Sequence, residues 1–179
     1  MAFILGFVGV ALIVAADKIT KILAYEHLRP RVRVPLIDGF FSLHYSTNDG
    51  AAWGILGGQW VLLSIFSTVI SAVLVYFYIR LPKYIEEGRV RTIIRAAIVM
   101  ITGGAIGNLI DRVRPPHRVI DFFSFELINF PIFNIADIFI VCGAIMLCVM
   151  LVFFVKDSPK VTKTANEGNE ENVENFENV

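Results

Sequence analysis

Charged residues are scarce in this sequence, and they are unevenly spread. They make up 18% of its 179 residues, whereas an average soluble domain has about 25%. Lys and Arg together number 16, as do Asp and Glu, so the formal net charge is zero and there is no basic surplus of the kind that binds nucleic acid. Long stretches without charge are typical of segments that lie in lipid. The composition therefore argues against both a nucleic-acid-binding protein and a soluble domain.

Cysteine and histidine are also rare, with two and three residues respectively. Cys142 and Cys148 lie in one apolar run, and on a helix their spacing places them on different faces, too far apart for a disulfide. We expect both to be small buried apolar residues. The histidines, His27, His44 and His117, lack the spacing of metal ligands. The sequence therefore predicts neither a metal site nor a cofactor.

Hydrophobic residues make up 56% of the chain and gather in four runs. Each run approaches the roughly 20 residues that a helix needs to cross a bilayer. The first run has no basic segment before it and no small-residue cleavage site after it, so we interpret it as a retained span rather than a signal peptide. The predicted spans are about 2–24, 59–79, 93–110 and 132–155. The fold class predicted is an all-α membrane protein with four transmembrane helices.

Basic residues beside the spans indicate how the chain is oriented. The loop between the second and third spans and the start of the tail are rich in Lys and Arg, and such segments lie in the cytoplasm by the positive-inside rule. The other loops also hold arginines, so the bias is small. Four spans then put both termini in the cytoplasm and two loops, at about 25–58 and 111–131, outside. We predict a membrane domain at 1–155 and a disordered, acidic cytoplasmic tail at 156–179.

The first outer loop has the pattern of strands. Segments 32–35 and 40–45 alternate partly and are rich in β-branched and aromatic residues. They flank Asp38 and Gly39, a pair typical of hairpin turns. We predict one or two short strands here, which form a small extracytoplasmic β-sheet resting on the membrane surface.

Polar residues within or beside the apolar runs need a reason, because a charged group at membrane depth costs several kcal/mol unless it is paired. Each one here also has a purely structural explanation, such as an anchor at a helix end, a turn, close helix packing or a helix cap. All of them nevertheless lie toward the outer side of the membrane, which one shared polar site explains better. The residues assigned to this site are Asp17, Asn48, Gly50, Asn108, Asp111, Arg112, Asp121, Asn134 and Asp137.

Carboxyl groups are the reactive groups of this predicted site. No histidine lies in a span, and both cysteines lie deeper in the fourth one, so neither a Ser/His nor a Cys/His nucleophile is expected. Two neighbouring aspartates share one proton; one then acts as a base on water and the other as an acid toward an amide. Asp121 and Asp137 suit this role best, because each lies in apolar sequence. We expect Asp111 to be held ionised by the adjacent Arg112 and to serve the structure.

Five blocks of sequence carry a resemblance to a known family. They are Asp17-Lys18, Asn-x-Gly-Ala-Ala-Trp-Gly at 48–54, Gly-Gly-Ala-Ile-Gly-Asn-Leu-Ile-Asp-Arg at 103–112, Val-Ile-Asp-Phe at 119–122 and Phe-Asn-Ile-Ala-Asp at 133–137. In this order they resemble the lipoprotein signal peptidases, a family also called signal peptidase II, over about residues 5–155. The sequence departs from the family pattern at Trp53, where phenylalanine is common, and at Ile138, where serine is common.

The resemblance implies an aspartic endopeptidase of the bacterial inner membrane with Asp121 and Asp137 as its catalytic pair. Its substrates would be prolipoproteins, cut on the N-terminal side of a diacylglyceryl-modified cysteine. Globomycin-type cyclic peptides would inhibit it, and membrane lipids would surround it. The resemblance also places Asp17 and Asp111 in support of a substrate site lined by Asn48, Gly50, Asn108, Arg112 and Asn134.

Two other functions use the same features. A small proton- or cation-coupled transporter would use Asp17, Asp121 and Asp137 as an ion path, and a non-catalytic assembly protein would use the small-residue face at Gly103 and Gly107. The sequence has no inverted internal repeat, and its polar residues lie toward one side of the membrane rather than across its midplane, so transport is disfavoured. We expect the protein to be a monomer.

Overall fold

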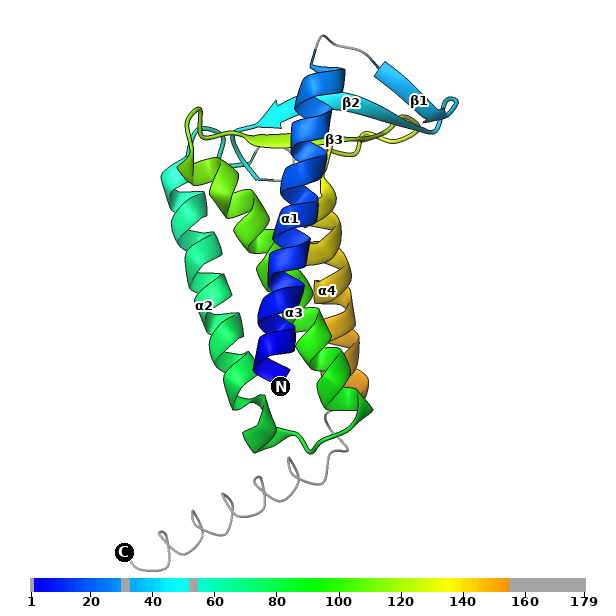
Figure 1. Ribbon diagram of the computed structural model, residues 1–179. Helices are drawn as coiled ribbons and strands as arrows, with labels where there is room; N and C mark the ends of the chain where they lie inside the picture. The colour runs from blue at the N-terminus through cyan, green and yellow to red at the C-terminus, as the bar shows by residue number, and fades with distance from the viewer. Residues whose placement is uncertain (1, 30–32, 52–54, 155–179) are drawn as a thin grey trace, which may run out of the picture.

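Four long helices form the body of the molecule. The computed structural model describes residues 2–29, 33–51 and 55–154; the predicted tail at 156–179 and Trp53 lie outside these ranges. The helices are α1 (Ala2–Leu28), α2 (Trp60–Tyr84), α3 (Arg89–Val113) and α4 (Ile135–Phe153). Each is long and apolar enough to cross a membrane, and Figure 1 shows them packed side by side. The four predicted spans are confirmed.

The outer surface of this bundle is apolar. Large side chains such as Leu12, Phe66 and Ile145 are 65%, 64% and 60% exposed. In water such a surface would drive aggregation, whereas in a bilayer it meets acyl chains that are equally apolar. The helices are therefore arranged for lipid around them, and they bury polar side chains such as Asp17, Lys21 and Asn108 inside.

Small residues let α3 lie at the centre of the bundle, in contact with the other three helices. A Cβ atom on Gly104 would lie only 2.4 Å from the backbone oxygen of Ala136 in α4. A Cβ atom on Gly107 would lie 2.8 Å from a carboxyl oxygen of Asp17 in α1. The glycine-rich segment thus allows two helices to approach α3 more closely than any larger residue would permit.

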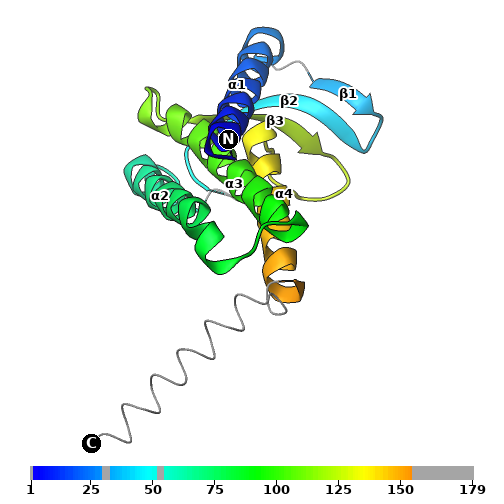
Figure 2. The ribbon, with the colours of Figure 1, turned by 60° about the horizontal axis from the view of Figure 1, so that its bottom comes forward.

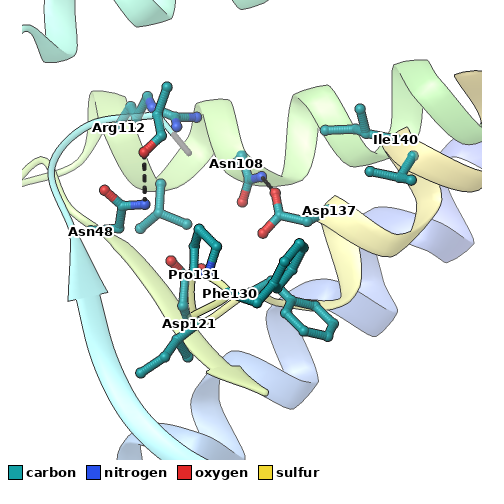
Figure 3. A pocket seen from close by; sticks show the side chains of 13 residues that line it. Asn48, Asn108, Arg112, Asp121, Phe130, Pro131, Asp137 and Ile140 are labelled. Carbon is teal, nitrogen blue, oxygen red and sulfur yellow. Dashed lines mark hydrogen bonds between the residues drawn. The ribbon is translucent and has the colours of Figure 1, made fainter. Parts of the chain in front are cut away.

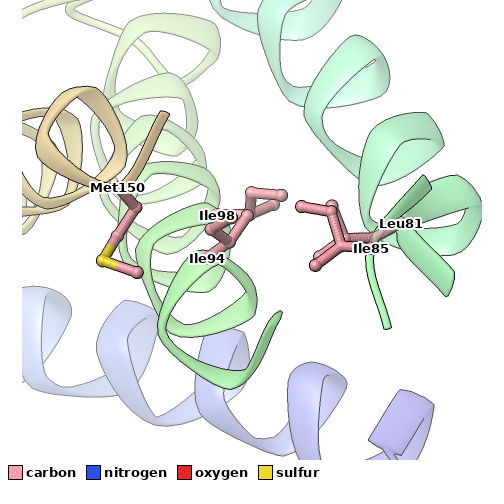
Figure 4. Close-up of a cluster of buried hydrophobic side chains, with 5 residues drawn as sticks. All are labelled: Leu81, Ile85, Ile94, Ile98 and Met150. Carbon is pink, nitrogen blue, oxygen red and sulfur yellow. The ribbon is translucent and has the colours of Figure 1, made fainter. Parts of the chain in front are cut away.

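An apolar cluster holds the bundle together at the end where α2 connects to α3. Its buried members are Leu81, Ile85, Ile94, Ile98 and Met150, which come from α2, the loop after it, α3 and α4 (Figure 4). This end of the molecule contains the basic residues of the loop between α2 and α3, which the sequence analysis assigned to the cytoplasm.

A three-stranded antiparallel sheet lies across the opposite end of the bundle (Figures 1 and 2). Its strands, in spatial order, are β1 (Arg33–Ile37), β2 (Phe41–Asn48) and β3 (Val119–Phe125). The first two form the predicted hairpin, and Gly39 in its turn has a φ of +68°, a conformation that glycine adopts without steric cost.

The third strand lies in the second outer loop, for which the sequence analysis predicts no strand. β3 pairs with β2 so that Ser46 lies opposite Asp121. Its residues include valine, isoleucine and phenylalanine, which favour strands. This strand fixes the position of Asp121, one of the two aspartates predicted to act as a pair.

The sheet is attached to α1 by a second apolar cluster. Ala24, Leu28 and Phe122 are buried in it, and Tyr45 and Ile135 pack against them. The last turn of α1 is part of this contact, so the helix continues to Leu28 rather than ending near residue 24 as predicted. The fourth helix begins at Ile135 instead of residue 132, because the side chain of Asn134 caps its N-terminus.

One prediction about side-chain burial was wrong. Cys142 and Cys148 are free, as expected, but both are exposed on the surface of α4. The buried positions of this helix are Ala136, Gly143 and Met150, and these face its neighbours. A uniformly apolar helix does not reveal from its sequence which face meets lipid.

The close contact at Gly104 leads to a test of packing. Gly104→Ala should destabilise the protein by about 1–3 kcal/mol, because the new methyl group meets the backbone of α4 and forces the helices apart. Gly9→Ala is the matched control, since its methyl group would meet only the Cγ1 atom of Val99, at the end of a side chain that can adjust. Thermal unfolding in detergent measures both, and equal unfolding temperatures would contradict the proposed close packing.

Candidate active site

Polar side chains converge where the sheet meets the bundle. Asp17 comes from α1, Asn108, Asp111 and Arg112 come from the last turns of α3, and Asp137 comes from the first turn of α4. Asn48 lies at the end of β2, Gly50 follows it, Asp121 lies in β3, and Asn134 immediately precedes α4. The structure therefore brings the predicted site residues into one region, although they are spread over more than 100 positions of the chain.

Two asparagine amides hold the two candidate catalytic carboxyl groups. Asn134 Nδ2 donates to Asp121 Oδ1 over 2.6 Å and to Asn108 Oδ1 over 3.1 Å. Asn108 Nδ2 donates to Asp137 Oδ1 over 2.8 Å. Asp121 and Asp137 are thus connected through a continuous chain of hydrogen bonds, in which each amide has a fixed direction.

Asp137 is also part of the helix cap. Its backbone N–H donates to Asn134 Oδ1 over 3.0 Å, and its Oδ2 accepts from the Asn134 N–H over 3.1 Å, which together form a capping box. The N-terminus of a helix carries a partial positive charge that favours an anion. The contacts of Asp137 are therefore those of a carboxylate acceptor, held in one orientation by the start of α4.

Asp121 has a different environment. Its side chain is buried, with only 3% exposed. Burial and the nearby charge of Asp137 raise its pKa to about 7, although hydrogen bonds from Asn134 and Asn48 and the charge of Lys21 act against them. Two carboxyl groups in such different surroundings can hold one proton between them at neutral pH, with Asp121 as the protonated partner.

Both carboxyl groups line the same cavity, whose volume is about 190 Å³. Figure 3 shows this cavity, with the side chains of Asn48, Asn108 and Arg112 on its wall and Phe130 beside the two aspartates. A single water needs roughly 10–15 Å³ of such volume, so several waters fit. The cavity can therefore supply the water that an aspartic hydrolysis consumes.

A second groove meets this cavity from the side of the bundle. Its volume is about 510 Å³, and it is lined by side chains of α2 such as Leu62, Phe66 and Ile70. It shares with the first cavity the residues Ala51, Asn108, Arg112, Asp137 and Ile140. Asp137 thus lies at the junction between a partly polar cavity and a mainly apolar groove.

Behind the two aspartates lies a set of paired buried charges. Asp17 is 0% exposed and Lys21 is 2% exposed; Lys21 Nζ donates to Asp17 Oδ2 over 2.8 Å. Asp111 pairs with Lys18 and also lies 2.8 Å from Lys21 Nζ. Asp17 Oδ1 in addition accepts the backbone N–H of Ala136 over 3.2 Å, so α1 supports the start of α4.

The expected partner of Asp111 was wrong. It is paired with lysines from α1 rather than with the adjacent Arg112, because neighbouring positions on a helix point in different directions. Arg112 instead donates from its Nη2 atom to the backbone oxygen of Gly50 over 3.1 Å. This contact ties the segment after β2 to the end of α3.

Sequence reasoning missed Lys21 as part of the site. A signal was available, since Lys21 follows Asp17 by four positions and shares its helix face within an apolar span.

Ile138, the departure from the family pattern, is 37% exposed. Among the described residues, no group of three or more His, Cys, Asp or Glu side chains is arranged to hold a metal ion.

Comparison with known proteins identifies the family. The family model described as Signal peptidase (SPase) II matches residues 9–153. The chain belongs to the signal peptidase II family. A lipoprotein signal peptidase from Caldanaerobacter subterraneus is 41% identical over 150 residues, which are 83% of this chain and 97% of that protein. One from Bacillus subtilis is 36% identical over 155 residues, 85% of this chain and 94% of that protein.

Two solved structures of bacterial membrane enzymes are similar to this chain. A bacterial membrane enzyme shares 31% of its sequence with this chain at a TM-score of 0.72, over 82% of this chain and 87% of its own. A second bacterial membrane enzyme has a TM-score of 0.70 and 30% identity, over 83% of this chain and 93% of its own. The chain is therefore a peptidase of the membrane, and none of these matches supports the transporter alternative.

The burial of Asp121 beside Asp137 leads to a prediction about its titration. Infrared difference spectroscopy should show the carboxyl group of Asp121 losing its proton near pH 7. In Asp137→Asn the pKa of Asp121 should be lower, because a neighbouring negative charge is gone, yet still above its ordinary value because burial remains. Asp38→Asn, in the hairpin turn, should leave it unchanged. Titration of Asp121 near pH 4 in the unmodified protein would contradict the assignment.

Proposed function

We propose that this signal peptidase II is an aspartic endopeptidase that removes signal peptides from prolipoproteins, on the N-terminal side of a diacylglyceryl-modified cysteine. The observation that carries the proposal is the pair of aspartates, Asp121 and Asp137, joined by two asparagine amides at the edge of one cavity. Family membership supports peptidase chemistry, and the carboxyl pair supplies groups that can perform it.

The different surroundings of the two carboxyl groups suggest their roles. Asp137, with its N–H donors and its place at a helix N-terminus, starts as the ionised base and takes a proton from water. Asp121, whose pKa is raised to about 7, starts protonated and donates toward the oxygen of the scissile carbonyl. The attacking water thus gains nucleophilicity as the carbonyl gains positive character, and no metal is needed for either step.

Substrate entry from the membrane explains the two grooves that meet at Asp137. The mainly apolar groove along α2 suits the acyl chains of the modified cysteine, because these chains already lie in the bilayer. The peptide backbone of the substrate would lie in the cavity beside the aspartates. The residues proposed to contact or position it are Asn48, Gly50, Asn108, Arg112 and Asn134. Asp17 and Asp111 support it from behind through their lysine partners.

The proposed reaction uses residues of one chain and calls for no second copy, as expected for a monomer. A globomycin-type cyclic peptide would inhibit the enzyme by occupying the same cavity.

The proposed orientation follows from the basic residues at the end where α2 connects to α3, which belong in the cytoplasm by the positive-inside rule. Both termini then lie in the cytoplasm, and the sheet and the aspartates lie at the outer face of the inner membrane.

Cleavage of a lipidated prolipoprotein by the purified protein in detergent tests the proposed activity. Asp121→Asn and Asp137→Asn should each lower kcat by about 10²–10⁴-fold or more, because each removes a proton-transfer group. The shortened product is measured by mass spectrometry. Asp38→Asn serves as the matched control, since it makes the same change in an exposed turn.

Full activity of either active-site variant would remove that aspartate from the mechanism. Cleavage should continue in the presence of a chelator, and a loss that zinc restores would overturn the metal-free mechanism.

Below about pH 7 the aspartate pair keeps its shared proton, so the rate of cleavage should fall as the pH rises beyond that value.

Cysteine labelling in intact cells tests the orientation. In a variant with Cys142 and Cys148 replaced by serine, a cysteine at Asp38 should react with a membrane-impermeant maleimide, because the hairpin faces outward. A cysteine at Glu86, which is exposed in the loop between α2 and α3, should react only after the cells are opened. The reverse result would invert the protein in the membrane.

A further inference from the structure

Among the residues that the structure describes, Lys21 is the cation that touches both the buried charge pairs and the amides of the candidate active site. Its side chain is 2% exposed. Its Nζ atom donates to Asp17 Oδ2 and to Asn108 Oδ1, each over 2.8 Å, and lies 2.8 Å from Asp111 Oδ2 as an ion pair without hydrogen-bond geometry. It therefore does more than neutralise a carboxylate, since one of its contacts is to an uncharged side chain that binds Asp137.

The contact with Asn108 determines which way that amide points. An ammonium group has donors and no acceptor, so Lys21 can face only the oxygen of the amide. Asn108 Oδ1 is accordingly turned toward Lys21, and Nδ2 is left to donate to Asp137 Oδ1 over 2.8 Å. A reversed amide would place its NH₂ group against the ammonium and its oxygen against the carboxylate of Asp137, and both contacts would be repulsive.

The same orientation reaches the other aspartate. With Oδ1 of Asn108 fixed, the Nδ2 atom of Asn134 finds an acceptor there over 3.1 Å while it donates to Asp121 over 2.6 Å. Lys21 thus orients the amide that donates to Asp137 and keeps an acceptor in place for the Asn134 amide that donates to Asp121, whose direction is also held by the helix cap.

We propose that Lys21 is a positioning residue for catalysis, which holds the Asn108 amide in the one orientation that presents donors to the aspartate pair. This role rests on the proposed function. It goes beyond charge pairing, because Lys18 also neutralises Asp111 from the same helix and has no contact with Asn108 among the described interactions.

Among the residues that the structure describes, charged groups of four elements lie at or behind the aspartate pair. They come from α1, α3, β3 and α4, and are those of Asp17, Lys18, Lys21, Asp111, Arg112, Asp121 and Asp137. Of the two lysines, Lys21 is the one that acts on Asp121, where its positive charge favours loss of the proton. A change at Lys21 should therefore alter the pH dependence of the reaction, whereas a change at Lys18 should not.

Two double variants separate positioning from charge balance. Lys21→Met alone would leave Asp17 buried without a counter-ion, so charges are removed in pairs. Asp17→Asn with Lys21→Met leaves Lys18 to pair with Asp111, and Asp17→Asn with Lys18→Met leaves Lys21. Both lose one acid and one lysine from α1 and share the change at Asp17; they differ in whether an ammonium group faces Asn108.

With a lipidated prolipoprotein as substrate, the variant lacking Lys21 should have a kcat about 10- to 100-fold below that of the variant lacking Lys18, because the donors at the aspartates lose their alignment. KM and the unfolding temperature should be similar in the two. The basic limb of the profile of kcat against pH should move to higher pH in the variant lacking Lys21 only, since the charge that favours ionisation of Asp121 is gone.

Equal kcat values and equal pH profiles in the two variants would show that the lysines are interchangeable counter-ions, and the positioning role would be wrong. That outcome, with an active wild-type protein, leaves the proposed peptidase function in place. A wild-type protein that fails to cleave lipidated prolipoproteins would overturn the proposed function itself, and the positioning role with it.

Discussion

Neutralisation of buried charge is the constraint on which this structure depends. Carboxylates and ammonium groups at membrane depth cannot be solvated by lipid, so each must find its partner inside the protein. Lys21, which pairs with Asp17 on α1, meets Asp111 and Asn108 on α3. That contact requires close approach, and glycine at position 107 provides the space for the carboxyl group of Asp17. Helix packing and charge pairing thus specify the same arrangement.

The geometry of the proposed catalytic pair depends on these ion pairs. Asp17 supports the first turn of α4 through the N–H of Ala136, and the capping box fixes Asp137 there. The sheet supplies Asp121 from a strand that is anchored to α1 by Phe122. Two carboxyl groups from distant parts of the chain are therefore set by rigid elements, which is the condition for a precise acid–base pair. Both line a partly polar cavity, and Asp137 also lines the mainly apolar groove along α2.

Much of this could be predicted from the sequence because its signals are local. Four apolar runs predicted four spans, and Asp38-Gly39 predicted the hairpin between β1 and β2. The strand β3 was missed, because a short segment that contains an aspartate resembles an irregular loop until its partner strand is known. The exposure of Cys142 was also misjudged, since an apolar helix in a membrane protein has no polar face to mark its outside.

The sequence by itself determined the number of spans, the end of the bundle at which polar residues gather, and the pair of aspartates that could act together. These follow from hydrophobic length and from the cost of placing charge in lipid, and both are properties of short segments. Only the tertiary structure decided the partners: Asp111 with lysines of α1, Arg112 with Gly50, and Lys21 with Asn108. These contacts join residues 93, 62 and 87 positions apart, and the direction of an amide depends on which donor reaches it after the helices have packed.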